Sequence, residues 1–161
     1  MARRAKVSHA APYRHFPRRE ALLAALAAQG FESLEAAQRK AVATGGLRAM
    51  GEAFVRFALA RPQRFGLMFG GLLPLARHAR LREVATRCLE GLSGALAARV
   101  ADAPGAHDAS IAAWALVHGL AQLLLGGRIA ETERRGRGEE QFVRDVLASV
   151  RFVARQAQSS A

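Results

Sequence analysis

The segment at residues 109–127, ASIAAWALVHGLAQLLLGG, constrains the fold of this chain most, because it is a helix-length run with apolar residues on nearly every side. A helix that is apolar all round is stable in water only where other parts of the structure cover it. His118 and Gln122 interrupt the run, which favours a buried core helix over a membrane-spanning one. We therefore expect this helix at the centre of a bundle.

The remainder of the chain has the composition of an all-α protein. Ala and Leu dominate, hydrophobic residues make up 51% of the 161 positions, and no run alternates apolar and polar residues over the length of a strand. Apolar spacing predicts helices over 18–42, 47–60, 78–100, 108–127 and 139–156, with short helices near 8–16 and from Pro62. Thr44-Gly45-Gly46 predicts a stop, and 102–108 predicts a loop from which Asp108 caps the next helix. The expected fold is a compact, all-α helical bundle.

The charge is strongly basic, with 24 Lys+Arg against 13 Asp+Glu and a formal net charge of +11. Such a balance favours an anionic partner, nucleic acid first and a membrane surface second, although a charge that serves solubility alone is an equal alternative. Basic residues crowd the first 20 positions. Cys88 is the single cysteine, which excludes an internal disulfide, and the N-terminus lacks the apolar region of a signal peptide. Both features predict a cytoplasmic protein.

Two separate motifs resemble one family. The stretch AKVSHAAPYRHFPRREALLAALAAQGF, residues 5–31, resembles the end of the helix-turn-helix in tetracycline-repressor-like (TetR family) transcriptional regulators. Downstream, AWALVHGLAQLLLGG carries Trp114, His118 and Gly119 and resembles the WHG type of TetR C-terminal domain, and ARPQRFGLMFGG resembles a segment midway. The resemblance implies a partial helix-turn-helix with a connecting helix over 1–43, and a ligand-binding and dimerisation domain over 44–161.

The resemblance also implies a DNA-binding surface. The residues that it assigns to DNA contact are Ser8, His9, Ala10, Tyr13, His15, Arg18 and Arg19. The first three would face base edges, and the others would bind phosphates near the start of the long helix. The alternative to DNA contact is an ordinary surface position, and it applies to Tyr13, His15, Arg18 and Arg19.

The family's first helix has no counterpart here, and only MARRA corresponds to its second helix. A short recognition helix without that support is marginal in water. We therefore expect this chain to bind operator DNA weakly or not at all, and we expect Met1 to be a start codon assigned inside a longer reading frame.

An effector pocket is expected in the C-terminal part, because small-molecule sites are largely apolar with a few polar groups. The candidate lining residues are Phe54, Phe57, Phe65, Met68, Phe69, Trp114, His118 and Gln122. His118 and Gln122 are either polar handles for a ligand or, for His118, the commoner case of a buried histidine satisfied by a protein partner. Gly119 is expected to permit close helix approach.

By resemblance, the helices over 108–127 and 139–156 would form a four-helix bundle with the same pair from a second subunit, and both carry more apolar surface than a one-sided contact needs. The implied function is a transcriptional regulator, a repressor relieved by a small apolar effector. A ligand-binding dimerisation module without DNA binding, and a basic protein that binds acidic surfaces without specificity, are the alternatives. An enzyme, a metal site and a cofactor are not expected, because no H-E-x-x-H, C-x-x-C or phosphate-loop pattern occurs.

Overall fold

The computed structural model describes residues 19–97 and 103–150, and these residues form helices and their connections. In chain order the elements are α1 (Arg19–Ala60), α2 (Pro62–Phe69), the 3₁₀ turn η3 (Leu75–Arg77), α3 (Ala79–Ala97), α4 (Ala103–Leu125) and α5 (Glu139–Ser149). The described ranges contain no strand. The all-α prediction is therefore confirmed.

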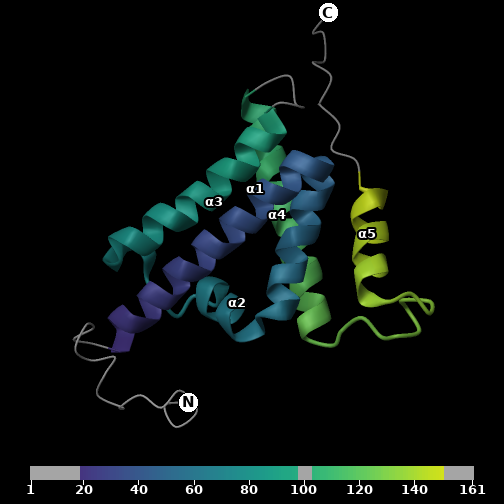
Figure 1. Cartoon of the computed structure of the whole chain (residues 1–161), viewed down its shortest axis with the longest axis horizontal. Coiled ribbons are helices and arrows are strands. Elements are labelled where there is room, and N and C mark those ends of the chain that lie inside the picture. The colour runs from purple at the N-terminus through teal and green to yellow at the C-terminus, as the bar shows by residue number, and fades with distance from the viewer. Residues whose placement is uncertain (1–18, 98–102, 151–161) are drawn as a thin grey trace, which may run out of the picture.

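Helix α1 consists of two arms that meet at a bend. Gly46, at φ 69° and ψ −158°, has a non-helical conformation between them. In Figure 1 the first arm rises from the purple end of the chain to the bend, and the second arm descends from there toward α2. The stop that the sequence predicts at Thr44-Gly45-Gly46 is confirmed.

Replacing Gly46 by alanine should destabilise the fold by about 1–3 kcal/mol, because its combination of positive φ and extended ψ is essentially restricted to glycine. Gly91 provides the matched control. It is exposed on α3, and a Cβ there would meet no atom within 4 Å, so Gly91→Ala should stabilise the protein by up to about 1 kcal/mol. Urea denaturation of the two variants measures both effects. Equal shifts of the same sign in both variants would contradict the assigned bend.

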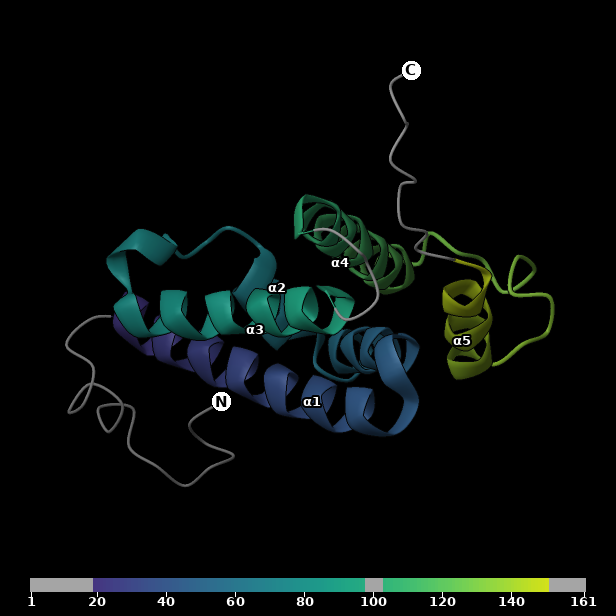
Figure 2. The ribbon, with the colours of Figure 1, turned by 90° about the horizontal axis from the view of Figure 1, so that it is seen from above.

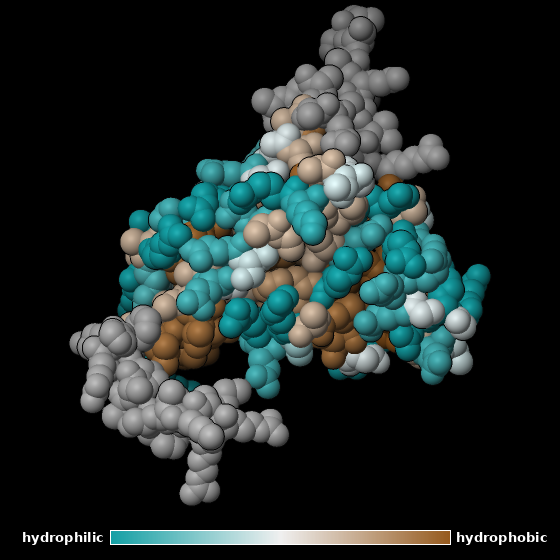
Figure 3. Space-filling model, in the orientation of Figure 1, coloured by the Kyte–Doolittle hydropathy of each residue, from teal (hydrophilic) through white to brown (hydrophobic). Residues whose placement is uncertain are grey.

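The other helices pack around the bend. Helix α3 lies along the first arm and also contacts α4, while α4 and α5 pack on the second arm (Figures 1 and 2). Ion pairs link α3 to the first arm, with Arg80 Nη2 at 2.6 Å from Glu32 Oε1 and Arg87 Nη2 at 3.2 Å from Glu35 Oε2. The Arg80–Glu32 pair is largely exposed and contributes little stability, while the Arg87–Glu35 pair is partly buried. Hydrophilic side chains predominate on the face shown in Figure 3, with hydrophobic patches between them.

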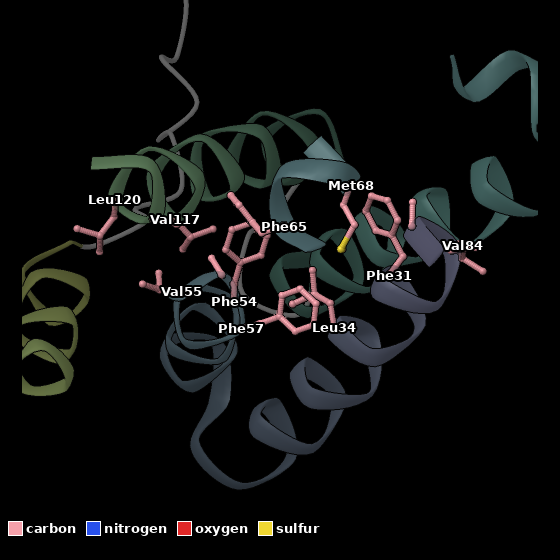
Figure 4. Close-up of a cluster of buried hydrophobic side chains, with 14 of the residues drawn as sticks. Phe31, Leu34, Phe54, Val55, Phe57, Phe65, Met68, Val84, Val117 and Leu120 are labelled. Atoms are coloured by element: carbon pink, nitrogen blue, oxygen red, sulfur yellow. The ribbon is translucent and has the colours of Figure 1, made fainter. Parts of the chain in front are cut away.

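The main core lies where α2 packs on both arms of α1. Figure 4 shows Phe65 and Met68 of α2 pointing into this cluster, next to Phe54 of the second arm and Phe31 of the first. Phe65 is 1% exposed. A smaller cluster near the bend joins Met50, Leu92, Leu96 and Ala113.

Helix α4 differs from the prediction in its start and in its burial. It begins at Ala103, so the predicted loop over 102–108 and the cap at Asp108 are wrong for the described positions 103–108. Pro104 falls in the first turn, where its missing N–H has no intrahelical partner to lose. By length and composition alone, residues 107–125 could cross a membrane, a test that core helices of soluble proteins also pass. Within the described chain, 28% of that window is buried.

The prediction that α4 is central within the chain is therefore wrong. One face packs on α1 and α3, while Ile111, Trp114 and Leu123 remain 41%, 37% and 47% exposed. Apolarity on all sides cannot distinguish burial within the chain from burial by a ligand or a partner. Helix α5 ends at Ser149, where Val150 turns extended, so it is shorter than predicted over its described part.

Candidate ligand cavity

A cavity of about 870 Å³ lies between α1, α3 and α4, with the end of α5 at one side. Its lining includes Phe54 and Met68 from the main core cluster and Met50 and Leu92 from the smaller cluster, so it lies where the two clusters meet. This volume falls within the range of sites that hold small molecules.

Aromatic rings form one wall of the cavity. The imidazole of His118 lies among the rings of Phe65, Phe69, Phe54 and Trp114, with centroid separations of 5.2, 5.1, 6.1 and 6.1 Å. Of these five residues, all but Phe65 line the cavity. The rings come from α1, α2 and α4, so the cluster depends on the packing of α2 against the second arm.

His118 carries an unpaired polar atom within this ring cluster. Its Nδ1 is buried and has no hydrogen-bond partner among the described residues, while its Nε2 lies 3.5 Å from Nε2 of Gln122. Burial lowers the pKa of the imidazole, because the charged form is poorly solvated there. The side chain is therefore largely neutral at pH 7, and its buried Nδ1 is left without a partner among the described residues.

The lowered pKa of His118 predicts a loss of stability in acid. The unfolded histidine titrates near 6.5, so below that pH the unfolded chain binds more protons than the folded one, and the free energy of unfolding falls. The urea midpoint of the wild type should therefore drop further between pH 7.5 and pH 5.5 than that of His118→Phe, which keeps a ring in the cluster. Equal drops in the two proteins would show that His118 protonation does not oppose folding.

Polar side chains other than His118 also reach the cavity. Gln38 of the first arm is 7% exposed, and its amide has no hydrogen bond within the described ranges. Cys88 of α3 lies 3.4 Å from the carbonyl oxygen of Phe31, and burial raises the pKa of its thiol to about 12, so the thiol is protonated and unreactive at pH 7. Arg48 is the one charged residue in the described lining; its side chain is 62% exposed and lies 3.7 Å from Glu52.

The structure separates the predicted lining residues into three groups. Phe54, Met68, Phe69, Trp114 and His118 line the cavity. Phe57 and Phe65 do not line it: both are buried in the main core, at 4% and 1% exposure, because they point between α1 and α2. Gln122 is exposed and outside the lining, although it contacts His118.

Sequence reasoning missed one whole wall of the cavity. Helix α3 supplies Ala85, Cys88, Leu89, Leu92 and Leu96. They lie on the apolar side of this amphipathic helix, which faces α1 and α4. The sequence predicts a helix over 78–100 but gives no reason to separate cavity-lining residues from core residues along it. Gln38, a polar residue on the buried side of a helix, was the available signal.

The predicted DNA-contact residues fall almost entirely outside the described residues. Ser8, His9, Ala10, Tyr13, His15 and Arg18 all lie there. Arg19 is the first residue of α1 and is exposed. Gly119 does not mediate close helix packing in the described chain, because a Cβ there would meet no atom within 4 Å. Its position on the open side of α4 explains the difference.

The described residues form an all-helical domain with a largely apolar cavity beside His118. Residues 47–150 match the family described as "Tetracyclin repressor-like, C-terminal domain". The chain therefore belongs to the tetracycline-repressor-like family, as the resemblance predicts.

Solved structures agree with this assignment. The structure of a protein of unknown function from Rhodococcus sp. RHA1 is 32% identical over 91% of this chain and 78% of that chain, with a TM-score of 0.69. A crystal structure of a candidate regulatory protein, SCO4313, is 24% identical over 91% of this chain and 79% of that chain, with a TM-score of 0.66, and shows the shared fold. The comparison with curated proteins found no match.

Proposed function

We propose that the chain is a transcription regulator whose activity is set by a small, largely apolar effector bound in the cavity between α1, α3 and α4. The single observation that carries the proposal is this 870 Å³ cavity with the buried, unpaired Nδ1 of His118 on its wall, within a domain of the tetracycline-repressor-like family. A cavity of this size within a small domain costs stability unless a ligand fills it. Filling it would therefore stabilise the arrangement of the three helices.

The mechanism follows from where the cavity lies. Its walls include both arms of α1, and the first arm begins at Arg19, the last of the predicted DNA-contact residues. An effector with different affinities for two orientations of the first arm shifts the population toward one of them. If the chain is a repressor, the effector-bound orientation of the first arm places the DNA-contact residues out of register with the half-sites of the operator.

The proposal includes a homodimer through α4. The helix leaves Leu123 exposed and has open space at Gly119, as expected of a surface that a second copy covers. Ile111 and Trp114 are also exposed and border this surface where α4 lines the cavity. The described part of α5 buries Phe142, Val143 and Leu147 within the chain and leaves no large apolar side chain exposed. We therefore assign the larger share of this interface to α4. The proposed regulator acts in the cytoplasm.

Selection of DNA from a random-sequence library by the 161-residue chain tests the proposal. A selected sequence should bind with low affinity, as the sequence analysis predicts, yet more tightly than a scrambled control. The ratio between the two should persist as salt is raised, because base readout is less salt-dependent than phosphate contact. A cavity ligand should change this affinity. Binding that collapses equally for all sequences would reject specific regulation, and cavity binding without DNA binding would favour the ligand-binding dimerisation module.

A further inference from the structure

The chemistry of the cavity wall narrows the class of molecule that fits. We propose that the cavity takes an uncharged aromatic molecule whose hydroxyl or amide group hydrogen-bonds Nδ1 of His118. This inference rests on the proposed effector site and specifies its ligand. It uses two features of the wall, the absence of buried charge in its described part and the position of the one unpaired imidazole nitrogen.

The charge of the ligand follows from the lining. Among the described lining residues only Arg48 is charged, and its side chain is mostly exposed and lies near Glu52. A carboxylate or ammonium group moved into the interior would lose its hydration without gaining a countercharge, which is strongly unfavourable. The buried part of the ligand is therefore neutral.

The aromatic character follows from the ring wall. Phe54, Phe69, Trp114 and His118 line the cavity from three different helices, and their rings contact one another. Offset and edge-to-face contacts with such rings favour a flat aromatic ligand over an aliphatic one of equal area. Phe31 extends the same wall from the first arm and contacts Phe69 at 5.1 Å between centroids.

The polar group follows from the unpaired atoms. Neutral histidine offers one donor and one acceptor, and Nδ1 of His118 is buried with no partner in the part of the chain that the structure describes. Because this atom is buried, a ligand group pairs with it only when the imidazole turns toward the cavity that His118 lines. A ligand hydroxyl or amide can both donate and accept, so it pairs with either tautomer. Gln38, on the first arm, supplies a second polar side chain to the cavity lining.

Competition against a fluorescent probe tests this ligand class. N-phenyl-1-naphthylamine is neutral and aromatic, and it would be titrated into the full chain at pH 7.5 and then displaced by four naphthalenes that differ in one group: 2-naphthol, 2-methylnaphthalene, 2-naphthoate and 2-naphthylmethylammonium. The naphthol should displace the probe at about tenfold lower concentration than either charged compound.

Two variants assign the effect to His118. His118→Phe keeps a ring in the cluster and should weaken 2-naphthol about tenfold while leaving 2-methylnaphthalene within about twofold. His107→Phe makes the same chemical change at an exposed site of α4 outside the cavity and should change neither. Thermal unfolding of both variants would establish that each is folded.

The outcomes separate the two proposals. If the probe itself does not bind, the proposed effector site fails. If the probe binds but 2-naphthoate or 2-naphthylmethylammonium displaces it as well as 2-naphthol does, the neutral ligand class is wrong while the effector site stands. If 2-naphthol binds His118→Phe as tightly as the wild type, the hydrogen bond to Nδ1 is wrong.

Discussion

Replacing Phe65 by alanine should lower the free energy of unfolding by about 3–5 kcal/mol. Phe65 is 1% exposed, and its ring centroid lies 5.7 Å from that of Phe54, 4.8 Å from that of Phe69 and 5.2 Å from that of His118. Its removal opens a hole where α2 packs on the second arm of α1, which neither helix can close without moving. Urea denaturation measures the change.

Leu72 supplies the control for this substitution. It lies in the connection after α2 and is 69% exposed, so Leu72→Ala should change the free energy of unfolding by no more than about 0.5 kcal/mol. A Phe65→Ala variant as stable as Leu72→Ala would mean that α2 does not pack on α1 as described. The cavity wall, which depends on the same packing, would then be in doubt as well.

Filling the cavity from α3 should abolish most binding of N-phenyl-1-naphthylamine. Ala85 and Leu89 line the cavity one turn apart and are half-buried, so the double variant Ala85→Trp/Leu89→Trp places two indoles where the ligand would lie. We expect affinity for the probe to fall about a hundredfold, which corresponds to about 2.7 kcal/mol. Fluorescence titration measures the dissociation constant.

A matched pair of substitutions outside the cavity controls for the added tryptophans. Leu22 and Ala25 are half-buried on the first arm of α1 and do not line the cavity. The variant Leu22→Trp/Ala25→Trp should therefore bind the probe as the wild type does. Equal affinity in all three proteins would place the probe somewhere other than the cavity.

The helical class and the bend could be predicted because both depend on local sequence. Apolar residues at helical spacing and a Gly-Gly pair indicate helices and a break without reference to the rest of the chain. The boundary at 103 could not be predicted in this way. Pro104, Gly105 and Asp108 are typical of a loop, yet a first helical turn accommodates proline equally well.

The position of the cavity depends on packing between distant segments, which residue types do not encode individually. Phe54 and Phe57 are three positions apart and chemically identical, yet one lines the cavity and the other fills the core. The same limit applies to His118: the sequence left a satisfied core histidine and a ligand handle as alternatives. The unpaired Nδ1 favours the handle.

A crystal structure of the chain with N-phenyl-1-naphthylamine would show whether the cavity between α1, α3 and α4 is the effector site. We expect the naphthyl ring in this cavity, in contact with Leu89 of α3, and the amine of the probe near Nδ1 of His118. A cavity that stays empty at saturating probe, or a probe bound only on the outer surface near the exposed Leu72, would contradict the assignment of this cavity as the effector site.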